Sequence, residues 1–374
     1  MRIVVNSIYL QGEPLKSTSF LEDFLGFLCI KYPETQFYFL VNKGTDGHYP
    51  SSANASIITT DYTINSFVSL KIWSSIKLPM VLRKLNASVL IQPFGLTTIA
   101  TNIPQILFMY DLTWMQKPAL LPPTFRLLHR VFGQKIIQKS AQIVTLSQSL
   151  QQQLINQLPV LATKTTVIGG AISSVFQPIS SEHKQQIKNV YADGRSYFLF
   201  IGGNDPSKNV VGVIKAFSSF KRWQKSNMKL LIMGPFTPQK EDMLKKLSSY
   251  KYKDDVVVLK NLSKEQTVLI TASAFALIVP YLHVTEESAM TLLTSMQCGV
   301  PVIASNFEAM TEFGGDSCLY VSPDETDEIA NKMKHLYRDE QLQTTLKVNG
   351  LQQAALYNWD NTANKFWDML LKVI

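Results

Sequence analysis

The sequence predicts an α/β fold made of two doubly wound domains in tandem. Short β-branched and aromatic runs alternate with segments of helical periodicity, which is typical of parallel sheets with helical crossovers. A length of 374 residues is too great for one typical core. The alternation weakens at Gly169 and restarts at Tyr197, so we expect an interdomain linker over residues 169–196.

The first half alternates strands and helices. Strands are expected at the apolar runs 2–8, 37–41, 89–92, 106–110, 142–146 and 165–168. Helices are expected at 17–30, at 67–85 with a break near Pro79, at 123–139 behind an initial proline, and from a Ser147 cap to about residue 157. Residues 44–65 are polar and predict no clear element. We assign residues 1–178 to the first domain.

The second half repeats the alternation. Strands are expected at 197–201, 229–233, 255–259, 275–279 and 300–304, and helices at 210–223, 240–247, 263–273 and 288–298. Residues 342–374 have a helical pattern throughout. We assign residues 179–357 to the second domain and expect the last helix, 358–374, to pack back on the first.

The stretch 280–303 is the one around which the chain is organised. An apolar strand leads into an acidic loop at Thr285, Glu286 and Glu287, and Ser288 then opens a helix that Gly299 ends. Such a unit places the positive end of a helix at the carboxyl edge of a parallel sheet, where an anionic ligand fits. The alternative is an ordinary buried unit whose acidic loop is only solvated.

Composition narrows the class of protein. A hydrophobic content of 46% with 17% charged residues excludes a largely disordered chain. No apolar run approaches the length of a membrane span, and the first residues lack the features of a signal peptide. Cys29, Cys298 and Cys318 lie in apolar surroundings without metal-like spacing. We therefore expect a cytoplasmic protein with buried, reduced thiols.

Positive charge is concentrated in the first half. Residues 1–178 hold 14 Lys/Arg against 7 Asp/Glu, and the remainder holds 22 against 21. The predicted helix 123–139 carries Arg126, Arg130, Lys135 and Lys139 among apolar residues, which favours peripheral contact with an anionic membrane surface. An ordinary surface helix is the alternative. Basic stretches interleaved with aromatic residues are absent, which argues against a nucleic-acid partner.

Two further loops follow predicted strands. In GGNDPSKN, the glycines allow close backbone approach to a ligand and Lys208 supplies a point charge, although a tight turn with an exposed lysine explains the same pattern. In MYDLTW, Asp111 follows a strand, where it could equally be a cap. No Asp-x-Asp pair occurs, which argues against a divalent metal holding a diphosphate.

Several motifs resemble those of the group 1 (family 4) retaining nucleotide-sugar glycosyltransferases of the GT-B fold, and they occur in the same order as in that family. In the second half these are FLFIGGNDPSKNVVGVIKAF, LSKEQTVLITASAFALIVP, TEFGGDSCLYVSPD and a Trp359 at the start of the last helix. The segment EESAMTLLTSMQCGVPVIAS is similar to the family pattern E-G-F-G-L-x-x-L-E-A-M-A-x-G-x-P-V-I. In the first half the likeness is fainter and rests on PQILFMYDLTW and AQIVTLSQSL.

The chain departs from the family pattern at several polar positions. Glu286 matches the first Glu of the motif (with Glu287 as the alternative), whereas Thr294 stands at the second. Gly203 replaces an Arg that binds phosphate in many members. Tyr110 replaces the His of a His-Asp pair, and Gly12 alone remains of a glycine-rich first loop.

The resemblance implies two Rossmann-like domains facing across a cleft and a retaining sugar transfer, without metal or cofactor, in polysaccharide biosynthesis. It implies a nucleotide-diphosphate sugar as donor and a saccharide or lipid-linked acceptor. Glu286 and Asp111 would be catalytic, and Gly12 and Tyr110 would lie on the acceptor side. The implied donor-binding residues are Gly202, Gly203, Lys208, Ser288, Ala289, Met290, Thr291 and Thr294.

Three other hypotheses about the function remain. A GT-B homologue that has lost catalysis could act as a binding or scaffold subunit, because three polar positions of the family differ here. A GT-B sugar-nucleotide epimerase fits the stretch 280–303 less well, and a nucleic-acid binder lacks its basic–aromatic stretches.

Overall fold

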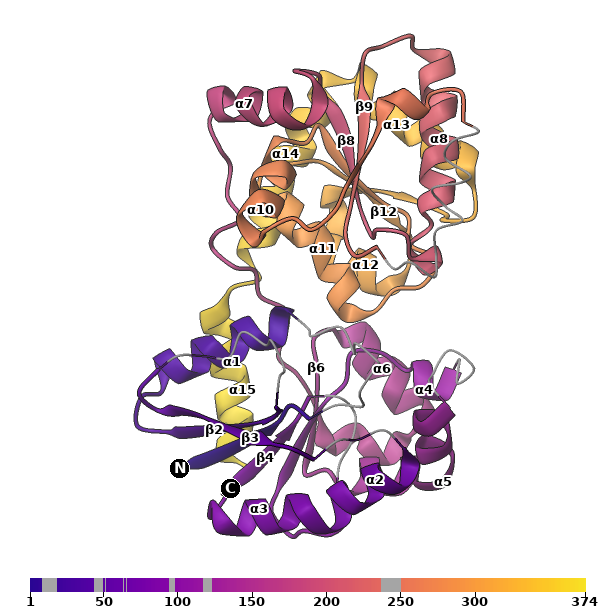
Figure 1. Ribbon diagram of the computed structural model, residues 1–374. Coiled ribbons are helices and arrows are strands. Elements are labelled where there is room, and N and C mark those ends of the chain that lie inside the picture. Colours follow the sequence, from indigo (N-terminus) through magenta and orange to yellow (C-terminus); the bar gives the residue numbers. More distant parts are fainter. Residues whose placement is uncertain are drawn as a thin grey trace. The chain divides into compact units, whose positions relative to one another are not determined.

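The chain forms two compact α/β units, each built on its own parallel sheet (Figure 1). The structure is a computed structural model that describes residues 1–8, 19–43, 50, 52–62, 64, 66–93, 98–116, 123–236 and 250–374. The first unit comprises Met1–Ala171 and Asn358–Ile374, and the second comprises Ile172–Tyr357. Gly12 and the helix expected at 240–247 lie outside the described residues.

The first unit has a seven-stranded sheet in the order β3-β2-β1-β4-β5-β6-β7. Its strands are β1 (Arg2–Asn6), β2 (Gln36–Asn42), β3 (Ala55–Thr60), β4 (Val89–Gln92), β5 (Gln105–Phe108), β6 (Gln142–Thr145) and β7 (Thr165–Val167). Every pair in the sheet is parallel. The order reverses between β1 and β4, which is the point where open α/β sheets bind ligands. The sequence did not indicate β3, because this edge strand is half-exposed and polar.

Helices cover both faces of the first sheet. They are α1 (Ser19–Lys31), α2 (Phe67–Ile72), α3 (Leu78–Lys84), α4 (Thr113–Gln116), α5 (Pro123–Lys139), α6 (Gln148–Gln157) and α15 (Trp359–Leu371). Residues of α2 and α3 pack on Val4 and Leu90, and those of α5 and α6 pack on Leu107. On the opposite face, aromatic side chains of α1 and α15 contact Phe108.

The helical segment 67–84 is not broken at Pro79. A π-helical turn, Trp73–Lys77, joins α2 to α3, and Pro79 occupies the first turn of α3. The amide of Leu78 bonds to the carbonyl of Trp73, five residues back. The wider turn absorbs the proline, which lacks an N–H, without ending the helix.

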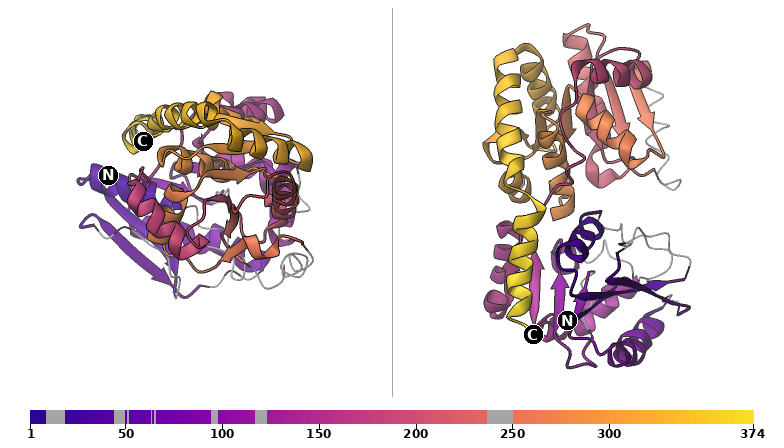
Figure 2. Two further views of the ribbon diagram at one scale, coloured as in Figure 1. Left: turned by 90° about the horizontal axis from the view of Figure 1, so that it is seen from above. Right: turned by 90° about the vertical axis from the view of Figure 1, so that its left-hand side faces the viewer.

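The last helix belongs to the first unit. The ring of Phe366 lies 5.2 Å from that of Phe24, and the ring of Trp359 lies 5.4 Å from that of Phe20. The Thr362 hydroxyl donates to the Gly170 carbonyl at 3.0 Å. Figure 2 shows α15, in yellow, lying along the first sheet. A break after α14 interrupts the helix that the sequence predicted over 342–374.

The second unit has a six-stranded parallel sheet in the order β10-β9-β8-β11-β12-β13. Its strands are β8 (Tyr197–Ile201), β9 (Lys229–Met233), β10 (Val256–Leu259), β11 (Ala276–Val279), β12 (Val302–Ser305) and β13 (Cys318–Val321). Its helices are α7 (Ser181–Ala192), α8 (Val210–Trp223), α10 (Lys264–Ser273), α11 (Glu286–Gln297), α12 (Glu308–Gly314), α13 (Thr326–Arg338) and α14 (Glu340–Ala355). Here the order reverses between β8 and β11.

The boundary between the units falls after Ala171, inside the expected linker 169–196, but the later part of this stretch is a helix. Ser180 caps α7, which ends at Asp193 in a left-handed conformation and contacts α10. The sequence did not predict this helix, because it has few apolar residues and they form no clear buried face. One of them, Val190, is exposed. The first unit ends at Ala171 and not at residue 178, because the Ile172 amide donates to the Tyr357 carbonyl within the second unit.

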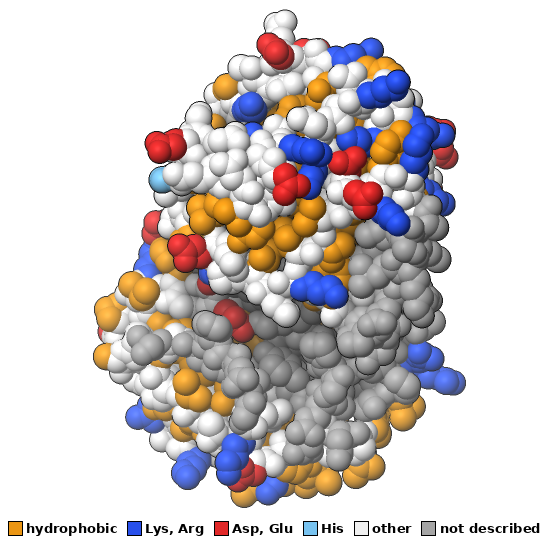
Figure 3. Space-filling view, turned by 45° about the horizontal axis from the view of Figure 1, so that its top comes forward, with side chains coloured by type: hydrophobic (Ala, Val, Ile, Leu, Met, Phe, Trp, Pro, Cys, Tyr) orange, Lys and Arg blue, Asp and Glu red, His pale blue; other side chains and the backbone are white. Residues whose placement is uncertain are grey.

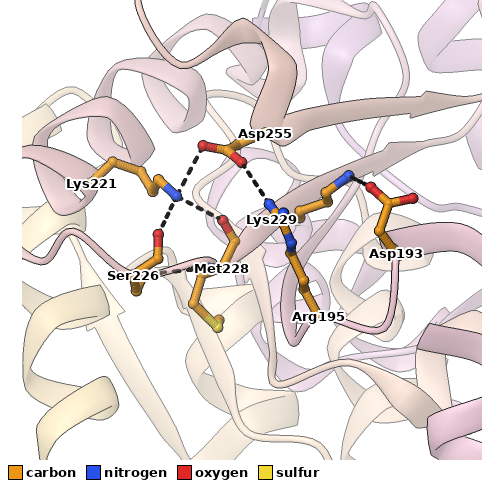
Figure 4. Close-up of polar contacts among 7 residues, drawn as sticks. All are labelled: Asp193, Arg195, Lys221, Ser226, Met228, Lys229 and Asp255. Atoms are coloured by element: carbon orange, nitrogen blue, oxygen red, sulfur yellow. Dashed lines mark hydrogen bonds and ion pairs between the residues drawn. The ribbon is translucent and has the colours of Figure 1, made fainter. Parts of the chain in front are cut away.

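A charged cluster joins the amino ends of strands β8, β9 and β10 (Figure 4). The Lys221 ammonium, on α8, lies 2.9 Å from the Asp255 carboxylate and also donates to the Ser226 carbonyl. Lys229 pairs with Asp193. Ligands of parallel sheets bind at the opposite, carboxyl edge, so we assign this cluster to stability.

Acidic and basic side chains are interspersed on the face of the second unit drawn in Figure 3. Within the described parts of the chain, we find no helix with the length and apolar character needed to span a membrane.

Candidate active site

The loops after β8 and β11 are joined by hydrogen bonds at the point where the second sheet reverses its order. The Ser207 carbonyl accepts from the Leu282 amide at 2.9 Å and from the His283 amide at 3.1 Å. Because β8 and β11 are adjacent, both loops leave the same edge of the sheet. The two segments singled out in the sequence therefore form one structure.

Asn209 fixes a third loop to the same place. Its backbone is left-handed, with φ of 64°, and separates the short 3-10 turn Pro206–Lys208 from α8. Its side-chain amide donates to the Pro323 carbonyl at 2.6 Å and to the Pro280 carbonyl at 3.2 Å. One side chain thus ties together the loops after β8, β11 and β13.

Lys208 lies over an aromatic ring from the neighbouring loop. Its ammonium is 4.2 Å from the centroid of the Tyr281 ring, a cation–π distance. Tyr281 is 1% exposed, and its hydroxyl donates to the Ile201 carbonyl at the end of β8. Burial raises the pKa of that hydroxyl above its usual value, so the hydroxyl stays protonated and keeps its hydrogen bond to the Ile201 carbonyl. Tyr281 therefore holds the Lys208 charge at the sheet edge.

Gly203 is required by the backbone that surrounds it. Its φ is +56°, and a Cβ atom there would lie 1.9 Å from the Pro235 carbonyl oxygen. Gly202 and Gly203 both donate their amides to the Met233 carbonyl, at 2.9 and 3.0 Å. No side chain fits at Gly203 unless the backbone moves, so this loop geometry excludes the arginine that many family members carry.

Helix α11 begins at Glu286, two residues earlier than the sequence predicted. Thr285 is the N-cap: its side chain accepts from the Ser288 amide at 3.2 Å, and the Ser288 hydroxyl accepts from the Thr285 amide at 2.8 Å. This reciprocal capping box satisfies two end donors at once. The box forms because Thr285 and Ser288 have the spacing that it requires, and this spacing was the sequence signal for the earlier helix start.

The earlier start changes which groups can meet a ligand. The Ala289 amide bonds to the Thr285 carbonyl, and the next amides of an α-helix bond four residues back. The amides of Ser288 and Ala289, two of the expected donor-binding residues, are therefore already bonded at the start of the helix. Ala289 and Met290 are also buried. The positive end of the helix dipole lies instead at Thr285–Glu287.

Two further predicted site residues, one catalytic and one donor-binding, lie on α11. Glu286 is only 2% exposed at the first position of α11. The Thr294 hydroxyl donates to the carbonyl of Thr291 at 2.8 Å, within its own helix. The side chain of Glu287, the alternative carboxylate, lies outside the description.

The remaining candidates lie in the first unit. Tyr110 and Asp111 are half-buried and follow β5, and the Tyr110 ring is 6.2 Å from that of Phe108. Two residues that the sequence analysis missed lie at the same sheet edge: Asn6 ends β1 and donates to Gln92, which ends β4, at 3.0 Å. Both are buried. Their position at the reversal of the strand order was the signal that could have identified them.

Neither thiols nor metal ligands gather at these edges in the described residues. Among these residues, no group of three His, Cys, Asp or Glu side chains could hold a metal ion. The three cysteines are buried and unbridged, and burial raises the pKa of each thiol to about 12. They are inert at neutral pH.

Comparison with known proteins assigns the family of this site. Residues 181–353, which include every loop of the second-unit site, match the model of the family described as glycosyl transferases group 1. The second unit is a group 1 glycosyltransferase domain. The matched residues contain Lys208, Asn209, Tyr281 and the whole of α11.

Relatives and solved structures agree with this family. The O-antigen chain mannosyltransferase B of Escherichia coli is 24% identical over 221 residues, 59% of this chain and 57% of that protein. The serotype-specific mannosyltransferase WbdA of the same species is 24% identical over 226 residues, but the match spans only 28% of its length. The chain thus spans no more than 57% of the length of either relative.

The structural neighbours extend over both units. Sucrose-phosphate synthase from Thermosynechococcus elongatus has a TM-score of 0.80 at 17% identity, covering 100% of this chain and 99% of its own. Anabaena HepE in complex with UDP-glucose has a TM-score of 0.77 at 13% identity, covering 100% of both chains. The group 1 domain and its companion unit therefore have the GT-B fold.

Proposed function

We propose that the protein transfers a sugar from a nucleotide-diphosphate sugar to a saccharide or lipid-linked acceptor, with retention at the anomeric carbon. The observation that carries this proposal is the junction of the Lys208 loop and the α11 loop at one sheet edge, inside the matched segment. Relatives named as mannosyltransferases of O-antigen chains favour a mannosyl donor and a bacterial surface polysaccharide. A neighbour solved with UDP-glucose supports a nucleotide-sugar ligand.

The chemistry assigned to this site is stabilisation of the leaving diphosphate. The Lys208 ammonium and the positive end of α11 would offset the negative charge that develops when the sugar–phosphate bond breaks. These two charges take the place of a metal. Glu286, which is shielded from water, would contact the sugar, and Thr294 would face the ribose. Asp111, in the first unit, would lie beside the acceptor. Interactions in a site that excludes water are stronger than in solution.

Donor binding is tested by calorimetry against a panel of uridine and guanosine diphosphate sugars. Replacing Lys208 by Ala should weaken binding of the best donor by roughly 1.5–3 kcal/mol, the range for a charged hydrogen-bond partner. Lys215→Ala, an exposed lysine on α8, is the matched control and should bind as the wild type does. An unchanged dissociation constant for Lys208→Ala would place the ligand elsewhere.

Catalysis is tested separately, with a transfer assay run with and without a metal chelator. Glu286→Ala should abolish turnover, Thr294→Glu should leave or improve donor binding, and the chelator should change nothing. If the wild type binds no nucleotide sugar and Thr294→Glu restores binding, the protein is a scaffold whose donor site has decayed. Two observations keep this alternative in the test: the glycine at position 203, and the Thr294 hydroxyl that bonds within its own helix.

We also propose that the first unit associates peripherally with an anionic membrane surface, where a lipid-linked acceptor would be found. The four basic residues of α5 that motivate this, Arg126, Arg130, Lys135 and Lys139, are all exposed. Flotation with anionic vesicles should recover the protein at low salt and lose it at high salt, because surface charge attraction is screened.

A further inference from the structure

The helical segment Phe67–Lys84 carries a stripe of exposed large apolar side chains. Val68 is 65% exposed, Ile72 38%, Ile76 54% and Met80 60%. We call these four residues the outward stripe. Scattered exposed apolar residues are normal on protein surfaces, but four along one helix at a constant spacing of four form a continuous patch.

The π turn keeps the outward stripe on one side of the helix. In an α-helix a spacing of four residues overshoots a full turn of 3.6, so a stripe with this spacing drifts around the axis. The turn Trp73–Lys77 bonds five residues back and therefore holds more residues per turn. Within this turn a spacing of four residues is less than one full turn, which offsets the drift of the stripe around the axis. The π turn thus aligns Val68 and Ile72 with Ile76 and Met80.

The other side of the segment is fixed in the core. Leu70, Trp73, Leu78 and Leu82 are at most 5% exposed and pack on Val4 and Leu90 of the first sheet. The helix therefore cannot rotate to bury its outward stripe without leaving the sheet. A helix that is apolar on both sides is normally covered on both.

The sequence around the outward stripe carries only positive charge. From residue 62 to residue 110 the sequence contains no Asp or Glu, and its four charged residues are Lys71, Lys77, Arg83 and Lys84. All four lie on this segment and are exposed. Helix α2 also contacts α5, which exposes Leu127 and Val131 beside its own basic residues. Apolar side chains edged by lysine and arginine are the pattern of a helix that lies in a membrane interface.

We propose that the outward stripe inserts into the surface of an anionic lipid bilayer, with Lys71, Lys77, Arg83 and Lys84 contacting the headgroups. This inference deepens the membrane association proposed above by naming the inserting element, and it is independent of sugar transfer. A second copy of this chain fits less well, because two such faces would bring eight positive charges together.

The test compares two triple variants of the full chain by vesicle flotation. One combines Val68→Gln, Ile76→Gln and Met80→Gln. Its control combines Val190→Gln, Leu356→Gln and Val348→Gln, which replace second-unit side chains of similar exposure, 72%, 65% and 48%. On vesicles of phosphatidylglycerol mixed with phosphatidylcholine, the stripe variant should lose at least about tenfold in partition, and the control none. Nucleotide-sugar binding should be unchanged in both.

Charge and self-association complete the test. Lys71→Gln with Lys77→Gln should reduce partition by roughly fivefold per residue, and pure phosphatidylcholine vesicles should bind weakly. Sedimentation velocity and thermal unfolding are measured on every variant. Flotation of the stripe variant equal to that of the wild type would overturn the proposal. So would a change from dimer to monomer in the stripe variant, since the stripe would then bind a second copy.

Discussion

Gly203 decides which charges the donor site can carry. A residue with φ of +56° and a carbonyl oxygen 1.9 Å from its missing Cβ cannot be exchanged for arginine by mutation of that residue alone. The loop after β9, at Pro235, lies directly against the loop after β8. The charge on the ligand must then be met by Lys208 and α11, which makes the position of Lys208 over Tyr281 more important.

The steric role of Gly203 is measurable against Gly299. Both glycines are left-handed, but a Cβ at Gly299 (φ of +67°) meets nothing closer than 3.9 Å. Gly299→Ala should therefore lose only the conformational cost, about 1 kcal/mol of unfolding free energy. Gly203→Ala should lose roughly 2 kcal/mol more through the clash. Equal losses in denaturant titrations would show that the Pro235 loop moves aside freely.

Asp193 should make the second unit sensitive to acid. Its hydrogen bond from Lys229, and then the charge of that lysine, hold the pKa of the carboxyl below its usual 3.8. A depressed folded pKa contributes stability above the unfolded pKa, and this stability is lost as the pH falls through the folded value. Asp193→Asn, which tolerates the left-handed backbone, should be less stable at neutral pH. Melting curves of the two proteins should converge below pH 3.8, and a constant gap would contradict the pairing.

At the scale of elements, the site depends on how α11 starts. Thr285 and Ser288 form one capping box, and Ser263 forms another with Gln266 at the start of α10. The two helices belong to the same unit, but only α11 begins at the loop bonded to Ser207. This pair of caps allows the effect of capping on stability to be separated from its effect on the ligand.

Removing either cap should cost the same stability and affect the ligand differently. Thr285→Ala and Ser263→Ala should each lower the unfolding free energy by about 1 kcal/mol. Thr285→Ala should also weaken nucleotide binding several-fold, because the end of α11 is no longer fixed beside Lys208. Ser263→Ala should leave the dissociation constant unchanged. Equal effects of both variants in calorimetry would remove α11 from the site.

Elements with a clear period of apolar residues were predictable from the sequence. Features that depend on contacts between segments distant in the sequence were not. The strand 197–201 and the Ser147 cap are confirmed, since each depends on local pattern. The π turn at Trp73 arises from packing on the sheet and the needs of Pro79, which no period reveals. Likewise, the hydrogen bonds of Asn209 reach residues 71 and 114 positions away, so local pattern could not predict them.

At the scale of the whole molecule, the chain leaves the first unit once and returns to it once. Residues 358–374 complete the core of the first unit although 186 residues of the second unit separate them from Ala171. Phe366, fully buried, contacts Phe24 and Phe108 there. The second unit has its own core, in which Phe217 is also fully buried. The folding of the first unit therefore depends on residues that are distant in the sequence.

Two buried phenylalanines should consequently report on two thermal transitions. Phe366→Ala should lower the melting temperature of the first unit by roughly 10 °C, as expected for the loss of 3–5 kcal/mol from a core, and leave the second unchanged. Phe217→Ala, its matched control, should do the reverse. A bound nucleotide sugar should raise only the transition that Phe217→Ala lowers, because binding stabilises the unit that holds the ligand. Calorimetric scans in which both variants and the ligand shift one common transition would show that the units unfold together, and a ligand shift in the transition that Phe366→Ala lowers would place the donor in the first unit.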